Sequence, residues 1–135
     1  MNFKAIIKMS NLTFQGAVGL NNSKYHVSLS LVEFNEDDIT IIYSPALDLS
    51  GYGNSEDEAK NSFNVALHEF IRYTSNKNTF NDVLKELGWE IKGSKKKPKF
   101  QPPLNSDLAQ NNPLYNDIIN GKNHKVFNQE IEFAI

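Results

Sequence analysis

Two hydrophobic periods follow one another along this chain. Residues 39–44 place apolar side chains at every second position, the pattern of a half-buried β-strand. Residues 55–73 place them at every third or fourth position, the pattern of an amphipathic helix. Ser55 followed by Glu58 forms a capping-box sequence, so we expect the helix to begin there.

The segment between this strand and this helix is rich in turn-forming residues. Pro45 cannot donate a hydrogen bond to a neighbouring strand, which places it at a strand end or a sheet edge. Gly51 and Gly53 supply the backbone freedom that a sharp reversal requires. The pattern therefore predicts a strand, an extended segment, a tight glycine turn and a helix.

Residues 25–31 also alternate between apolar and polar side chains. The polar residues 35–38 are predicted to close a hairpin from this strand to residues 39–44. Apolar positions change parity at Val32 and Phe34, which predicts a bulge or the end of the strand.

The first twenty residues are predicted to extend the same sheet. Residues 3–9 and 12–20 alternate in the same way and predict two strands paired as a hairpin. We interpret residues 1–20 as an N-terminal strand extension of the core.

The part of the chain after the long helix has weaker patterns. Residues 79–87 predict a second, shorter helix that Gly88 ends as a left-handed cap, and residues 89–92 predict a short strand. Residues 93–113, rich in lysine, proline and polar side chains, are expected to form a connecting loop. Residues 114–135 predict one helical turn and a terminal strand, which needs a partner in its own sheet or in another protomer.

Together these elements predict an α+β fold in one domain, residues 1–135. We expect an antiparallel sheet of about five strands, with one long and one short helix packed on one face. A chain of 135 residues is long enough to bury a core without metals or disulfides.

Composition excludes several kinds of site. The chain has no cysteine, which rules out disulfides and thiolate ligands, and its net charge of −2 argues against a wholly basic surface. No signal-peptide pattern or long apolar run is present, so we expect a soluble cytoplasmic protein without a membrane span.

Candidate chemistry is sparse. His26, His68 and His124 are far apart in sequence and lack the spacing of metal ligands. No carboxylate cluster and no nucleophile motif stands out. We therefore predict no catalytic residue, no metal and no cofactor, and expect the protein not to be an enzyme.

One stretch resembles a known family. The order of a strand, Pro-x-Leu, Gly-x-Gly-x-Ser, an acidic turn and an amphipathic helix is similar to the HicB-like family, across roughly residues 25–73 of a core spanning residues 24–92. The matching residues are Pro45, Leu47, Gly51, Gly53, Ser55, Glu56, Glu58 and Ala59.

The resemblance implies a fold and a function. It implies a partial ribonuclease-H-like domain that binds and masks a small HicA-like ribonuclease toxin, with no catalysis of its own, in an oligomeric assembly. Typical members carry Pro-Asp-Leu-Pro-Gly where this chain has a variant run. The partner-binding candidates in this variant segment are Tyr43, Pro45, Leu47 and Asp48. An open sheet edge is the second candidate surface.

Two alternatives remain open. The first is a stand-alone homo-oligomeric domain that has no toxin partner. The second is a nucleic-acid-binding protein that uses the one local basic patch, in the expected loop; its candidate residues are Lys95, Lys96, Lys97 and Lys99. Members of the family that bind DNA carry a separate helical module after the core, and we expect none in residues 101–135.

Overall fold

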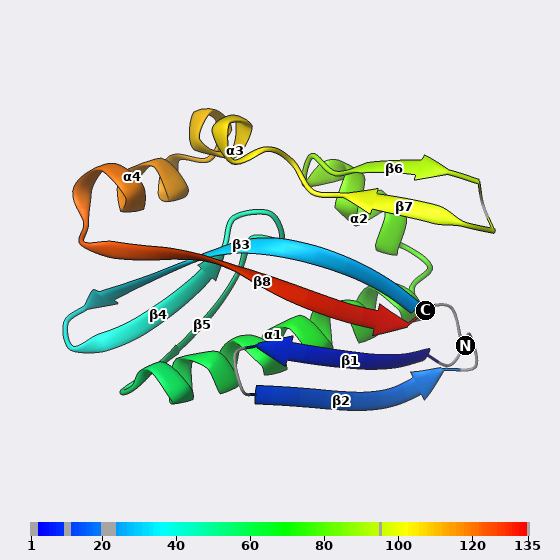
Figure 1. Ribbon diagram of the computed structural model, residues 1–135, viewed down its shortest axis with the longest axis horizontal. Helices are drawn as coiled ribbons and strands as arrows, with labels where there is room; N and C mark the ends of the chain where they lie inside the picture. The colour runs from blue at the N-terminus through cyan, green and yellow to red at the C-terminus, as the bar shows by residue number, and fades with distance from the viewer. Residues whose placement is uncertain (1–2, 10–11, 20–23, 95, 135) are drawn as a thin grey trace.

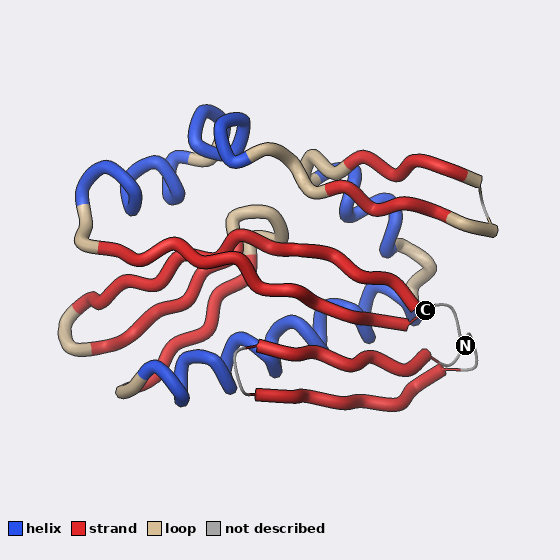
Figure 2. The backbone as a smooth tube through the Cα atoms, viewed as in Figure 1, coloured by secondary structure: helices blue, strands red, loops and turns tan. Residues whose placement is uncertain are grey.

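A six-stranded antiparallel sheet forms the centre of the protein (Figures 1 and 2). The computed structural model describes residues 3–9, 12–19, 24–94 and 96–134. The strand order is β2-β1-β8-β3-β4-β5, and β6 and β7 pair in a separate two-stranded sheet. The strands are β1 (Phe3–Met9), β2 (Leu12–Gly19), β3 (Lys24–Glu36), β4 (Ile39–Ser44), β5 (Leu49–Gly53), β6 (Glu90–Gly93), β7 (Pro98–Gln101) and β8 (His124–Ala134).

Two helices pack on one face of the large sheet, as predicted. They are α1 (Glu56–Asn76) and α2 (Phe80–Glu86). Leu67 of α1 and Leu84 of α2 meet Val27 and Leu29 of β3 in one apolar core. The structure confirms the α+β class, the long helix and the short helix.

Two further helices cover the opposite face, and here the prediction was wrong. Residues 93–113 were expected to form a loop, but they contain β7 and α3 (Asn105–Asn111). The single helical turn expected next is α4 (Pro113–Gly121), which begins where Asn112 accepts a hydrogen bond from the Tyr115 backbone nitrogen at 3.1 Å. Figure 1 shows β3 and β8 between α1 and the pair α3 and α4.

These two helices also explain the parity change in β3. Leu31 and Val32 are both fully buried, although they point to opposite faces of the sheet. β3 pairs without a register shift along both β4 and β8, so the predicted bulge is absent from these pairings. Both faces are apolar at this point because both are covered by helices.

Gly51 and Gly53 were assigned the wrong role. Both lie in β5, and the positive-φ glycines among the described residues are Gly88 and Gly93. A Cβ on Gly51 would lie 2.1 Å from the backbone nitrogen of Phe63 in α1. These glycines therefore allow a strand and a helix to approach closely, while Asp48, with φ of 53°, occupies the left-handed position in the preceding turn.

Other local predictions are confirmed. Asp37 and Asp38 have φ of 50° and 66° and close the hairpin from β3 to β4. Gly88, with φ of 94°, follows α2 as a left-handed residue. β1 pairs with β2 as an extension of the sheet, and the terminal strand β8 lies between β1 and β3, in the domain's own sheet.

Candidate functional site

Most of the predicted partner-binding residues are buried. Tyr43 is 3% exposed and Leu47 is 6% exposed, and Pro45 is also buried. Tyr43 and Leu47 belong to the core beneath the turn between β4 and β5, whereas Pro45 lines a cleft beside this turn. Asp48 alone of the four candidates is exposed.

The turn that carries Asp48 is held from below by Tyr43. The Tyr43 hydroxyl donates to Asp48 Oδ1 at 2.7 Å and accepts from Asn112 Nδ2 at 2.9 Å. Burial raises the pKa of Tyr43 to about 12, so the hydroxyl stays neutral and keeps its proton for Asp48. Tyr43 thereby fixes the turn after β4 relative to the start of α4.

Asp48 opens onto a cleft of about 620 Å³ between the turn, the end of α2 and the α3–α4 junction. We call this the acidic cleft, and the lining residues used below are Pro45, Asp48, Glu86, Leu87, Asp107 and Leu108. Its three carboxylates are exposed, and none takes part in an ion pair with another described residue. The cleft therefore combines net negative charge with apolar walls.

The sequence revealed only part of this site. Asp48 was a candidate because it lies in the variant segment of the motif, but Glu86 and Asp107 come from elements that are distant along the chain. Asp107 also lies in the segment that was predicted to be a loop. No periodicity or motif links these three carboxylates, and only the folding of α2 and α3 around the turn brings them together.

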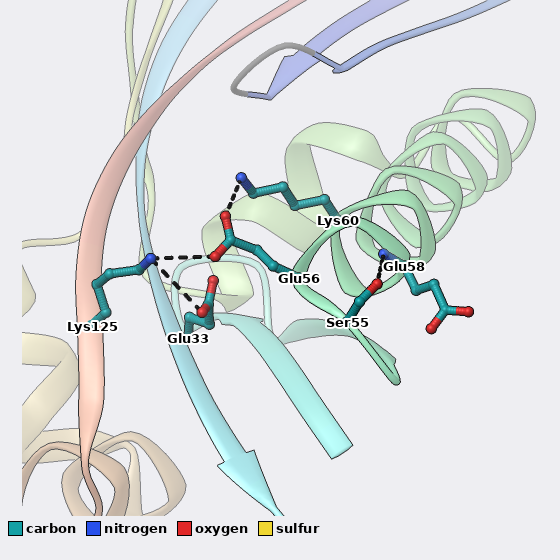
Figure 3. Close-up of polar contacts among 6 residues, drawn as sticks. All are labelled: Glu33, Ser55, Glu56, Glu58, Lys60 and Lys125. Carbon is teal, nitrogen blue, oxygen red and sulfur yellow. Dashed lines mark hydrogen bonds and ion pairs between the residues drawn. The ribbon is translucent and has the colours of Figure 1, made fainter. Parts of the chain in front are cut away.

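A second charged cluster lies between β3, β8 and the start of α1 (Figure 3). The Glu56 carboxylate accepts from Lys60 Nζ at 2.7 Å and from Lys125 Nζ at 3.4 Å. Lys125 Nζ also lies 3.8 Å from Glu33 Oε2. Two lysines thus face two carboxylates, a balanced set of ion pairs that joins the helix to the sheet.

The two carboxylates in this cluster differ in acidity. Burial, together with the nearby charge of Glu56, raises the pKa of Glu33, whose Oε1 is buried without a hydrogen-bond partner. The hydrogen bond from Lys60 lowers the pKa of Glu56. Sequence reasoning missed Glu33, although it shares the parity of Val27, Leu29 and Leu31 and so faces α1.

The helix start beside this cluster has the predicted cap. Ser55 Oγ accepts from the Glu58 backbone nitrogen at 3.2 Å (Figure 3). The Glu58 carboxylate accepts from the backbone nitrogen of Asn54 at 2.8 Å, one residue earlier than in the usual box. The cap orients α1 so that Glu56 points towards Lys125.

The outer edge of β5 is partly occupied. The Tyr52 backbone nitrogen donates to Ser62 Oγ of α1 at 3.1 Å. A side chain of the neighbouring helix thus satisfies a backbone group that an added strand would need. The other edge of the large sheet is β2.

The predicted basic loop is a β-hairpin. β6 pairs with β7, and Lys96, Lys97 and Lys99 are exposed. Lys95 lies outside the described residues. Phe100 holds the hairpin to the core through edge-on ring contacts with Tyr25 and Phe80, at centroid distances of 5.0 and 5.6 Å.

The histidines do not form a common site. His26 and His124 are exposed, whereas burial lowers the pKa of the partly buried His68. Among the described residues, no group of three histidine, aspartate or glutamate side chains is arranged to hold a metal ion.

In the same part of the chain, no helix is both long and apolar enough to cross a membrane.

Comparison with known proteins does not identify a relative. The chain matched no protein-family model, no curated protein and no solved structure.

Proposed function

We propose that this chain is a HicB-like antitoxin-type protein that works by binding a small basic ribonuclease toxin and masking it. The acidic cleft carries this proposal. It places three carboxylates without ion-pair partners, Asp48, Glu86 and Asp107, beside the segment where the chain departs from the family's usual sequence.

The cleft has the character that such a partner requires. A ribonuclease binds RNA phosphates with cationic side chains, so its RNA-binding surface is positively charged. An acidic cleft competes with RNA for those cationic side chains. Leu87 and Leu108 line the cleft and offer apolar contact to the alkyl stems of the same side chains. Binding in this way blocks the enzyme without any chemistry by the antitoxin.

The fold is compatible with the same proposal. The antiparallel strands β3, β4 and β5 lead directly into the capped helix α1, in the order that the resemblance implies. The residues of the resembling motif have structural roles here: Gly51 admits α1 to the sheet and Ser55 caps it.

Self-assembly is the competing interpretation. β2 is an outer strand of the large sheet, and an outer strand can pair with another protomer. A homo-oligomer is compatible with toxin binding, but a homo-oligomer alone would leave the acidic cleft without a function.

The decisive experiment is the native mass of the protein after gentle purification from its source cell, by light scattering and mass spectrometry. We expect a co-purifying basic protein of under about 100 residues, the size of a minimal domain, whose RNA cleavage this chain inhibits. A homo-oligomer with no such protein attached contradicts the proposal.

Variants then locate the interface. The cleft variant combines Asp48→Asn, Glu86→Gln and Asp107→Asn. We expect it to bind the toxin at least about tenfold more weakly, since long-range attraction and local pairing are both lost. The control makes the same change in charge at exposed carboxylates outside the cleft lining, and should bind normally; it combines Asp57→Asn, Asp117→Asn and Glu130→Gln.

A further inference from the structure

The hairpin β6–β7 lies at one end of the protein (Figure 1), and its sequence is rich in positive charge. Five of the chain's 14 lysine and arginine residues fall within residues 92–99, and the whole chain has a net charge of −2. The remainder of the protein is therefore distinctly acidic, and the hairpin is a separate basic feature.

Two of these lysines stand directly opposite one another. Lys92 of β6 is the cross-strand partner of Lys99 of β7, so their side chains project from the same face of the ribbon. Like charges opposite each other destabilise a strand pair. Glu90 relieves part of this repulsion, with its carboxylate 3.3 Å from Lys92 Nζ. Lys96, Lys97 and Lys99 form no ion pair with any described residue.

The ribbon presents these charges from a fixed support. Its inner face carries Ile91 and Phe100, and both pack against the core. Its outer face carries Glu90, Lys92 and Lys99. This alternation holds Lys92 and Lys99 in solvent on an anchored hairpin, and Lys96 and Lys97 lie in the connection between its two strands.

A groove of about 300 Å³ lies where the hairpin meets β3. The lining combines basic, amide and aromatic groups: Tyr25, His26, Lys92, Lys99, Phe100 and Gln101. Glu130 also approaches this region, with Oε1 3.4 Å from His26 Nδ1, so the positive charge is concentrated on the hairpin side.

We infer that the β6–β7 hairpin and its groove bind single-stranded nucleic acid. Lysines contact successive phosphates, while amide and aromatic groups meet the flexible bases of a single strand. This site is separate from the acidic cleft and does not depend on the proposed toxin partner.

The test is fluorescence anisotropy with a labelled single-stranded RNA of about 16 nucleotides, the upper end of common site sizes. We expect binding that weakens steeply with salt. The hairpin variant Lys96→Gln, Lys97→Gln, Lys99→Gln should bind at least about tenfold more weakly, with a salt slope smaller by about 2 because three phosphate contacts are lost. DNA of the same sequence shows whether the backbone or the 2′-hydroxyl is recognised.

A second triple variant controls for overall charge. It removes three exposed lysines outside the hairpin, through Lys77→Gln, Lys85→Gln and Lys122→Gln, and should bind RNA almost as well as the unmodified chain. Equal loss in the two triple variants, or no binding by the unmodified chain at low salt, overturns the inference.

A third comparison tests the groove without removing any lysine. Gln101→Glu adds a carboxylate to the groove, whereas Gln110→Glu adds one to the exposed surface of α3. We expect RNA binding to fall with Gln101→Glu and to change little with Gln110→Glu. Equal loss of RNA binding in the two variants would mean that overall charge alone governs binding, and would contradict a site in the groove. Circular dichroism verifies that every variant is folded.

Discussion

Gly51 of β5 lies so close to Phe63 of α1 that any side chain at position 51 would collide with the helix backbone. A Cβ built there would be 2.5 Å from Phe63 Cα and 2.7 Å from the Ala59 carbonyl oxygen. The backbones of β5 and α1 are therefore in direct contact at this point.

Gly51→Ala should destabilise the fold by about 3 kcal/mol, because neither backbone can give way without disturbing the core. Thermal unfolding followed by circular dichroism measures the loss. Gly121→Ala is the control, since a Cβ at the end of α4 meets nothing within 4 Å and should leave stability unchanged or slightly higher. Similar stability in the two variants would contradict the backbone contact between β5 and α1.

Glu33→Gln and Glu56→Gln should affect stability in opposite directions at pH 7. The pKa of Glu33 is raised in the folded protein from its ordinary value of 4.5. Its contribution to stability is thus fully present below pH 4.5 and is lost as pH rises through the higher folded value. Removing the charge with Glu33→Gln should raise the unfolding temperature at neutral pH.

The pKa of Glu56 is lowered, so its contribution is present above its ordinary pKa of 4.5 and is lost as pH falls through the lower folded value. Glu56→Gln should therefore lower the unfolding temperature at pH 7 and have little effect in acid. Denaturant unfolding between pH 3 and 8 compares the two variants. Parallel pH curves for both would contradict the opposite pKa directions.

Tyr43→Phe should destabilise the protein by about 1–2 kcal/mol, since it removes a hydroxyl with two hydrogen-bond partners. In the unmodified chain, the raised pKa of Tyr43 gives stability that is present below pH 10 and is lost as pH rises towards about 12. The variant should lose stability less steeply over that range. Tyr73→Phe is the control, because Tyr73 is 64% exposed.

Trp89→Phe tests the link between α2 and the turn after β4. Trp89 Nε1 donates to the Ala46 carbonyl oxygen at 2.7 Å, and both residues are buried. The substitution leaves a buried carbonyl without its donor, which should cost about 1–3 kcal/mol. Urea unfolding followed by circular dichroism gives the value. A difference below about 0.5 kcal/mol, the usual range for surface substitutions, would show that the carbonyl finds another donor.

The sequence predicted the elements whose side chains carry a long regular period. α1 has both a continuous apolar stripe and a cap at Ser55, so local pattern and tertiary packing agree. α3 buries one residue, Leu108, and is held largely by contacts with distant elements, such as Asn105 Nδ2 with Ser30 Oγ at 3.3 Å. A seven-residue helix of this kind has too short a pattern to be recognised from sequence.

The candidate site was predictable only where it coincided with a local signal. Asp48 lies in the variant segment of the motif, and five lysines fall within residues 92–99. Glu86 and Asp107 join Asp48 through the arrangement of α2 and α3, which one-dimensional patterns do not contain. Tyr43, a partner-binding candidate from the sequence, is buried in the structure, because an alternating strand does not show which of its faces a later helix will cover.

The position of β8 has a consequence for biosynthesis. β1 leaves the ribosome more than a hundred residues ahead of β8, the strand that joins it to β3. At 5–20 residues per second, the N-terminal hairpin waits roughly 10 s for that neighbour. Throughout this interval the nascent chain holds two unjoined pieces of sheet with open edges. A chaperone that binds unpaired strand edges would therefore recognise this nascent form, which the finished fold no longer displays.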